Sequence, residues 1–198
     1  MCWSNFTRIF FSPKKFFSKT RKEKNIDEAL KTYIVASLIG VILTVIVNLA
    51  FPGTMPMLFP ALGPMMAIAR GAMMFFVGII AIFLMSGLIH LFVPPLGGKK
   101  EFRKTFNALA YSAVPGAILM FLMYFNFYSL VIFGVLIFAW TITLEIMALS
   151  RHHNVSAGRA FMMILIPLSV LVAILLIILI FVSLAMLAYL GPQAFLNY

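Results

Sequence analysis

The sequence predicts an all-α fold: a polytopic bundle of five transmembrane helices with a cytoplasmic N-terminus and an outside C-terminus. Of its 198 residues, 64% are apolar and 10% are charged, whereas typical soluble domains carry about 25% charged residues. Several apolar runs reach the roughly 17–25 residues that a helix needs to cross the hydrocarbon core. The basic residues fall almost entirely on one predicted side of the membrane, as the positive-inside rule requires.

Residues 1–32 form a predicted cytoplasmic arm in which aromatic and basic side chains alternate. Ser12 and Pro13 are expected to be the N-cap and the first residue of a short helix. Such a segment can lie on the bilayer with its rings inserted, although a plain basic flank with some aromatic anchoring is the alternative. The cations expected to contact anionic lipid headgroups are Lys14, Lys15, Lys19, Arg21, Lys22 and Lys24.

A membrane domain follows over residues 33–190, and residues 191–198 form a short outside tail. Asn25 is expected to cap the first helix, with Glu28 completing a capping box. The five predicted spans cover residues 33–51, 71–93, 105–125, 128–149 and 161–190. The last run is ~45 Å long at 1.5 Å per residue, which predicts one tilted helix bent near Pro167. The count of five spans depends on the lengths of these apolar runs.

The distribution of charge sets the predicted orientation. Fourteen of the fifteen Lys and Arg residues lie in segments predicted to be cytoplasmic, and only Arg70 lies outside. The first outer connection instead carries prolines at every fourth position, which block a regular helix. These are Pro52, Pro56, Pro60 and Pro64. In the third span, Pro115 is expected to bend the helix, and Gly116 to allow close helix packing.

Few residues are suited to catalysis. Asp27 is the only aspartate, and Glu145 is the only glutamate within a span. Paired carboxylates, a Ser-His-Asp arrangement and a phosphate-binding glycine loop are all missing from the sequence. We therefore expect no catalytic residues, no metal site and no cofactor. The basic residues lie in short loops and one arm, which favours anionic lipid over nucleic acid as the partner.

The intramembrane polar residues gather near the predicted cytoplasmic ends of the spans. A carboxylate inside a membrane is costly unless it is paired or hydrated, so Glu145 is a functional candidate. The alternative is a structural pair with Arg103, Arg151 or a histidine. His152 and His153 are adjacent, so they do not share a helix face as a metal-binding pair would. The candidate polar cluster comprises His90, Asn107, Tyr111, Glu145, His152 and Arg159.

Two stretches carry a family resemblance. Residues 97–115 read GGKKEFRKTFNALAYSAVP, with a double glycine, a charged turn and a closing proline. This stretch resembles the central motif of the Yip-one (Ypt/Rab-interacting protein) membrane family, and residues 140–167 are similar to a later family segment. The resemblance covers residues 12–190 and implies five spans with the orientation given above. Eukaryotic members are associated with Rab-type GTPases, vesicle traffic and membrane shaping. The short arm looks more like a compact prokaryotic-type member, which implies the cell membrane of a prokaryote.

Three functional hypotheses follow. The leading one is a non-enzymatic membrane-organising or partner-binding protein that contacts the bilayer and either a membrane-protein partner or a second copy. The second is a small transporter or channel that uses Glu145 and the bent third span. The third is an accessory subunit of a membrane complex.

Overall fold

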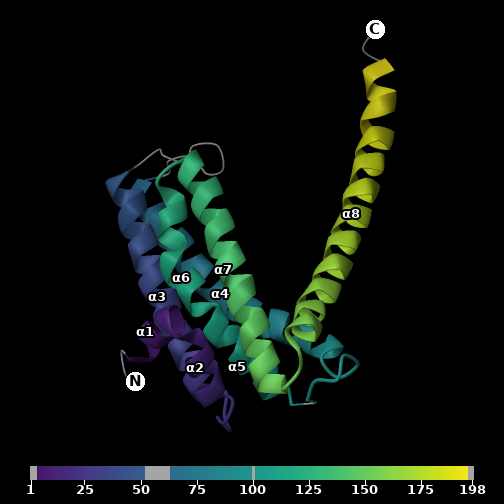
Figure 1. The fold of residues 1–198 in the computed structure, drawn as a ribbon. Helices are drawn as coiled ribbons and strands as arrows, with labels where there is room; N and C mark the ends of the chain where they lie inside the picture. Colours follow the sequence, from purple (N-terminus) through teal and green to yellow (C-terminus); the bar gives the residue numbers. More distant parts are fainter. Residues whose placement is uncertain (1–3, 52–62, 100, 196–198) are drawn as a thin grey trace.

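A computed structural model describes residues 4–51, 63–99 and 101–195, and every regular element within these ranges is a helix (Figure 1). Five of the described helical segments are long and apolar enough to cross a membrane. They are Asp27–Ala50, Met65–Phe92, Phe102–Tyr124, Phe127–His153 and Ala157–Met186. The predicted all-α class and the five spans are thereby confirmed. Which end faces the cytoplasm stays a prediction.

The arm folds into two short helices, α1 (Ser4–Phe11) and α2 (Pro13–Thr20), which lie against the bundle near one end (Figure 1). Helix α2 begins at Pro13 after Ser12, as predicted. The rings of Phe16 and Phe17 are buried within the protein. Insertion of these two rings into the bilayer is therefore a wrong prediction, because the bundle itself provides the apolar surface that covers them. Burial of each ring contributes roughly 1.5–3 kcal/mol.

Helix α3 (Asp27–Ala50) starts later than the sequence predicts. Its N-cap position is occupied by Ile26, with no side-chain capping bond. The carbonyl of Asn25 instead accepts a hydrogen bond from the third span, and the Glu28 carboxylate pairs with Lys31 at 3.8 Å. The predicted capping box is therefore wrong, because both of its members have other partners.

Helix α4 (Gly63–Phe92) ends in a turn built on the double glycine. The Gly97 amide donates to Pro94 O at 3.0 Å and the Gly98 amide to Val93 O at 2.9 Å, the bond pair of a Schellman motif. Gly97 adopts a φ of +83°, which favours glycine. A Cβ at Gly98 would lie 2.4 Å from Val93 Cγ1. Both glycines are therefore required by this turn.

The third span is interrupted, as predicted. It consists of α5 (Phe102–Ser112), α6 (Val114–Leu119) and the 3-10 segment η1 (Met120–Tyr124). Pro115 has no amide hydrogen and cannot continue the α5 hydrogen-bond ladder, so the helix breaks at Ala113. Helix α6 also approaches α3 closely: a Cβ at Gly40 would lie 1.8 Å from the Ala117 carbonyl oxygen.

Helix α7 (Phe127–His153) completes the bundle, and α8 (Ala157–Phe195) leans away from it (Figure 1). The buried residues of α8 in the described part of the helix lie in its first turns: Ala160, Met163, Ile164 and Pro167. The helix continues through Pro167, so the fifth span is one helix, as predicted. Of the outer-connection prolines, Pro52, Pro56 and Pro60 lie outside the described residues.

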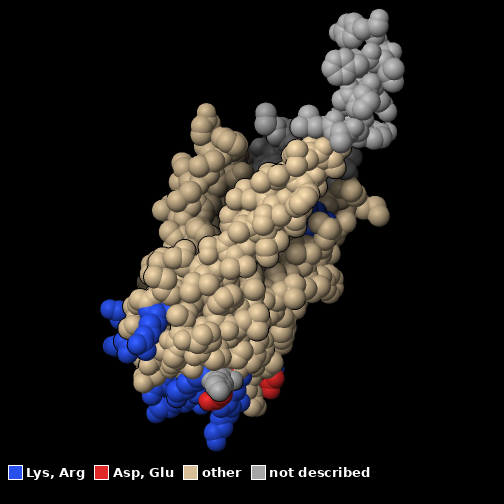
Figure 2. Space-filling view, turned by 90° about the vertical axis from the view of Figure 1, so that its right-hand side faces the viewer, with Lys and Arg blue, Asp and Glu red and all other residues tan. Residues whose placement is uncertain are grey.

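Charge is concentrated at one end of the molecule. Figure 2 shows Lys and Arg side chains gathered at the lower end of the bundle, below a surface almost free of charge. This lower end, where α1, α2 and α5 lie, is called the basic end below (Figure 1). The charge separation agrees with the segregation of basic residues in the sequence.

Candidate functional site at the basic end

Helix α5 is the centre of the basic end. All eight residues from Thr105 to Ser112 are buried, because α3, α4 and α7 all pack against this helix. Polar side chains on α5 are therefore hidden from bulk water and need partners within the protein. Two hydrogen-bonded networks supply them.

The first network joins α5 to the linker between α2 and α3. Tyr111 donates its hydroxyl hydrogen to Glu23 Oε2 at 2.8 Å, and Asn107 Nδ2 donates to Asn25 O at 3.0 Å. Arg103 lies one turn earlier on the same helix, so the three side chains follow one another at intervals of four residues and share a face. We call Arg103, Asn107 and Tyr111 the linker clamp.

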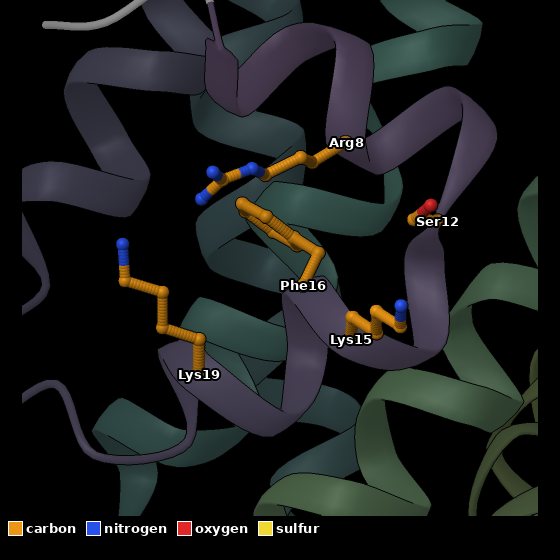
Figure 3. A pocket seen from close by; sticks show the side chains of 5 residues that line it. All are labelled: Arg8, Ser12, Lys15, Phe16 and Lys19. Atoms are coloured by element: carbon orange, nitrogen blue, oxygen red, sulfur yellow. The ribbon is translucent and has the colours of Figure 1, made fainter.

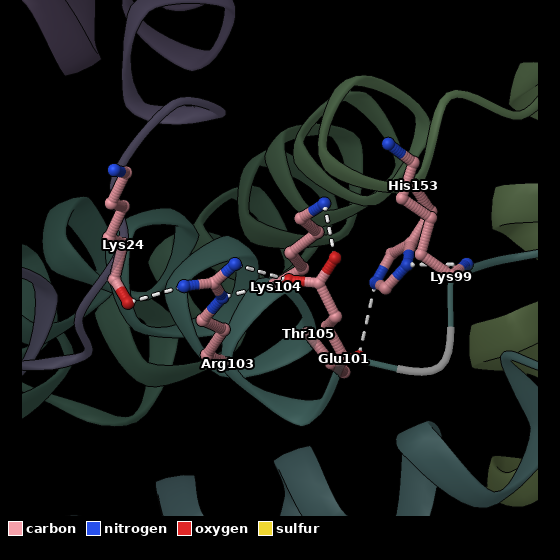
Figure 4. A network of polar contacts seen from close by, with 7 residues as sticks. All are labelled: Lys24, Lys99, Glu101, Arg103, Lys104, Thr105 and His153. Carbon is pink, nitrogen blue, oxygen red and sulfur yellow. Dashed lines mark hydrogen bonds and ion pairs between the residues drawn. The ribbon is translucent and has the colours of Figure 1, made fainter.

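Arg103 adds the third bond of the clamp and is itself held by a carboxylate. Its Nη1 donates to Lys24 O at 2.6 Å, and its Nε donates to Glu101 Oε2 at 2.9 Å (Figure 4). Lys104 Nζ lies 2.9 Å from the other oxygen of Glu101. The hydrogen bonds from Lys104 and Arg103 lower the pKa of Glu101 to about 2. Glu101 thus remains charged and orients the guanidinium toward the linker.

Glu23 lies in a different environment. Burial raises the pKa of its carboxyl group, and the hydrogen bond from Tyr111 acts in the opposite direction. Burial is the larger effect because the linker is pressed against the bundle at this point.

The second network joins α4, α5 and α7. His90 Nδ1 lies 2.8 Å from Thr105 Oγ1, which lies 3.1 Å from His153 Nε2. The Lys99 amide donates to His153 Nδ1 at 3.2 Å (Figure 4). Because Nδ1 accepts, the neutral His153 ring carries its hydrogen on Nε2 and donates to Thr105. The Thr105 hydroxyl then donates to His90, so one hydroxyl connects two spans to α5.

His152 has the opposite tautomer and a different role. Its Nδ1 lies 3.0 Å from Ala148 O, and a carbonyl only accepts, so Nδ1 carries the hydrogen. Within the described ranges its Nε2 has no hydrogen-bond partner, nor does Asn107 Oδ1. The ring packs edge-on against Phe17, with centroids 6.3 Å apart. Phe16 makes a similar contact with Tyr111 at 5.0 Å, so the arm covers Tyr111 of the first network and the His152 ring.

Glu145 and Arg159 join neither network. Glu145 is half-buried on α7 and makes no hydrogen bond or ion pair with any residue that the structure describes. The expected pair with Arg103 does not form, because the guanidinium is engaged by Glu101 and the linker. Nor does either neighbouring histidine take that role, since both bond elsewhere. Arg159 is exposed, and its Nη1 would lie 3.2 Å from a Cβ at Gly97.

The predicted cluster is thus divided among several places. Asn107 and Tyr111 both bind the linker, His90 belongs to the second network, and Glu145 belongs to neither network. Glu23 and Thr105 were not predicted as site residues. Glu23 had a signal, since it is the only acidic residue among the first 26. Thr105 had none, because a buried threonine in a helix is common.

The six arm cations predicted to contact headgroups are all exposed. They extend over α2 and the linker that the clamp holds, so the clamp sets the position of this charge. In the described part of the chain, no three His, Cys, Asp or Glu side chains are grouped to hold a metal ion. Contact between the six cations and lipid stays a prediction.

Comparison with known proteins agrees with this architecture. The model of the Yip1 domain family matches residues 7–180, which include most of the arm, the linker clamp, the double-glycine turn and most of α8. Searches of curated proteins and of solved structures give no match. The family match covers most of the chain, and five apolar helices accompany it. This multi-pass membrane protein therefore belongs to the Yip1 domain family.

Proposed function

We propose that this protein is a non-enzymatic membrane-organising protein in the cell membrane of a prokaryote. It binds anionic headgroups at its basic end and assembles there with a membrane-protein partner or a second copy of itself. One observation carries the proposal. The linker clamp fixes a cationic arm to the third span, so the protein presents a positioned basic surface rather than a free tail.

The use of the polar side chains supports a structural role for the basic end. Tyr111, Asn107 and Thr105 are residue types that enzymes often direct at substrates. Here each is buried and bonded to another part of the same chain. Their hydrogen bonds fasten the arm and join three spans, which favours a rigid platform over a reaction centre.

The test is capture of the intact protein from its native membrane after cross-linking. The clamp variant Asn107→Ala/Tyr111→Phe is compared with the wild type, and Tyr128→Phe serves as the control, since Tyr128 is 75% exposed on α7. We expect the wild type and the control to yield one stoichiometric partner or a dimer, and the clamp variant to lose it. Capture of a monomer alone from all three would contradict the proposal. A partner retained by the clamp variant would favour an accessory subunit that assembles through its spans.

One observation favours a second candidate, a small transporter or channel. Glu145 lies within a span and has no ion-pair partner in the described ranges. Intramembrane carboxylates of this kind often mark ion or proton pathways. Flux in proteoliposomes that carry the wild type or Glu145→Gln separates the two functions.

A further inference from the structure

The arm contains a cavity of about 300 Å³ between α1 and α2. It is lined by Arg8, Ser12, Lys15, Phe16 and Lys19 (Figure 3). We propose that this cavity binds the phosphate group of one anionic phospholipid. The inference rests on the proposed headgroup binding and assigns it to a defined place, which includes Arg8, a residue outside the six predicted cations.

The charge of the cavity suits a phosphate. Three cations from two helices line it, and no acidic residue is among the described residues of the lining. In Figure 3, the side chains of Arg8 and Lys19 extend to the same side of the Phe16 ring, while Lys15 lies near Ser12. A guanidinium can hold two phosphate oxygens at once, and an ammonium group adds a compact positive charge. The Ser12 hydroxyl supplies a neutral donor at the turn between the helices.

The cavity has a fixed floor. Phe16 is 3% exposed and packs against Tyr111, a member of the linker clamp. Ile9, which follows Arg8, is completely buried. Lys15 and Lys19 are four residues apart on α2 and therefore lie on the same face. The backbone positions that carry the three cations are thus held by the bundle, which lowers the entropy lost on binding.

Its position favours a lipid over a soluble anion. Helix α1 packs against α6, which belongs to the third span, so the cavity borders the apolar part of the molecule. Phe11 immediately precedes Ser12 and is 85% exposed. An exposed ring at the end of α1, the helix that carries Arg8, matches a ligand with a charged head and an acyl chain. Inorganic phosphate shares the head chemistry but would leave the ring without a partner.

The experiment measures binding of phosphatidylglycerol to the full chain in phosphatidylcholine nanodiscs. The cavity variant Arg8→Gln/Lys15→Gln/Lys19→Gln removes three charges. Its matched control, Lys31→Gln/Lys99→Gln/Arg151→Gln, removes three exposed charges elsewhere in the basic segments. We expect the cavity variant to weaken binding at least about tenfold and the control less than twofold, which corresponds to about 1.4 kcal/mol against less than half of that. Equal losses would mean diffuse attraction and overturn the proposal.

Two further measurements complete the experiment. The charge-preserving variant Arg8→Lys/Lys15→Arg/Lys19→Arg should keep most of the binding, and circular dichroism confirms that each variant folds. Inorganic phosphate, added up to millimolar concentration, should compete only weakly with the lipid. Tight phosphate binding without phosphatidylglycerol binding would instead identify a soluble-anion site and overturn the assignment to lipid. Partner capture by the clamp variant reports on the proposed function separately, because that variant keeps all three cavity cations.

Discussion

The hydroxyl of Tyr111 donates to Glu23 Oε2 at 2.8 Å, although the two residues are 88 positions apart in the chain. The bond joins the third span to the segment that precedes the first. It is accompanied by two bonds from the same helix face, so the arm is attached to the bundle at three consecutive linker residues. The first prediction concerns this bond.

Tyr111→Phe should lower the free energy of unfolding by about 1.5–3 kcal/mol, the range for a hydrogen bond to a charged group. The variant keeps the ring that packs against Phe16 and removes only the donor. Unfolding in detergent by denaturant measures the change. Tyr128→Phe is the control, because that hydroxyl lies on an exposed residue. Equal stabilities for both variants would show that the bond contributes nothing.

The second prediction concerns pH. Burial raises the pKa of Glu23 above 4.5 in the folded protein. The contribution of this carboxyl group to the free energy of unfolding is therefore complete below its pKa in the unfolded chain, and it is lost as pH rises through its pKa in the folded protein. Glu23→Gln should remove this loss, so the unfolding midpoint of the variant should fall less between pH 4 and pH 8 than that of the wild type.

Glu101→Gln provides a contrast of opposite sign. The pKa of Glu101 is lowered to about 2, so its contribution is present above about 4.5 and lost as pH falls toward 2. Identical pH profiles for the two variants would contradict both assignments.

The third prediction concerns helix packing. Gly40→Ala would place a Cβ 1.8 Å from the Ala117 carbonyl oxygen, a backbone atom that moves only if α6 moves. We expect a loss at the upper end of the roughly 1–3 kcal/mol that overpacking costs. Gly87→Ala is the matched control, since nothing lies within 4 Å of its added Cβ. It should be neutral or stabilising by up to about 1 kcal/mol. Thermal unfolding of both variants decides the matter.

The fourth prediction concerns Glu145. A half-buried carboxylate without an ion pair in the described ranges gains little from its charge, so Glu145→Gln should leave stability unchanged or raise it. Loss of a structural pair would instead cost about 1–3 kcal/mol. The proposed function also expects no pH-dependent flux in wild-type proteoliposomes. Robust flux that disappears in the Gln variant at unchanged stability would establish the transporter alternative.

The fifth prediction concerns orientation. A reporter fused after Tyr198 should be found outside, and one inserted between Lys99 and Lys104 should be found inside, because fourteen of the fifteen basic residues then face the cytoplasm. Reporter activity in whole cells distinguishes the two compartments. A cytoplasmic signal from the C-terminal fusion would reject an odd number of crossings.

The elements of the fold were predictable because apolar run length is a local property. The break at Pro115 follows from a missing amide hydrogen, and the shared face of Asn107 and Tyr111 follows from their spacing. Their partners did not follow, since residues 82 and 88 positions apart meet only after the spans pack.

The two wrong predictions have the same cause. Asn25 has the local pattern of a helix cap, but Asn107 holds its carbonyl in the linker. Phe16 and Phe17 have the pattern of bilayer anchors, but the bundle provides a surface that covers both rings. In each case a tertiary contact overrode a local preference. Such a contact cannot be predicted from the local pattern of a single sequence.

The docking of the arm also fixes an order of assembly. Residues of α2 leave the ribosome before those of the spans, yet Phe17 packs against His152, which is made about 135 residues later. At roughly 5–20 residues per second, synthesis of the intervening chain takes on the order of ten seconds. During that interval Phe17 lacks its His152 partner. The contact between α2 and α7 therefore forms only after the fourth span has been made.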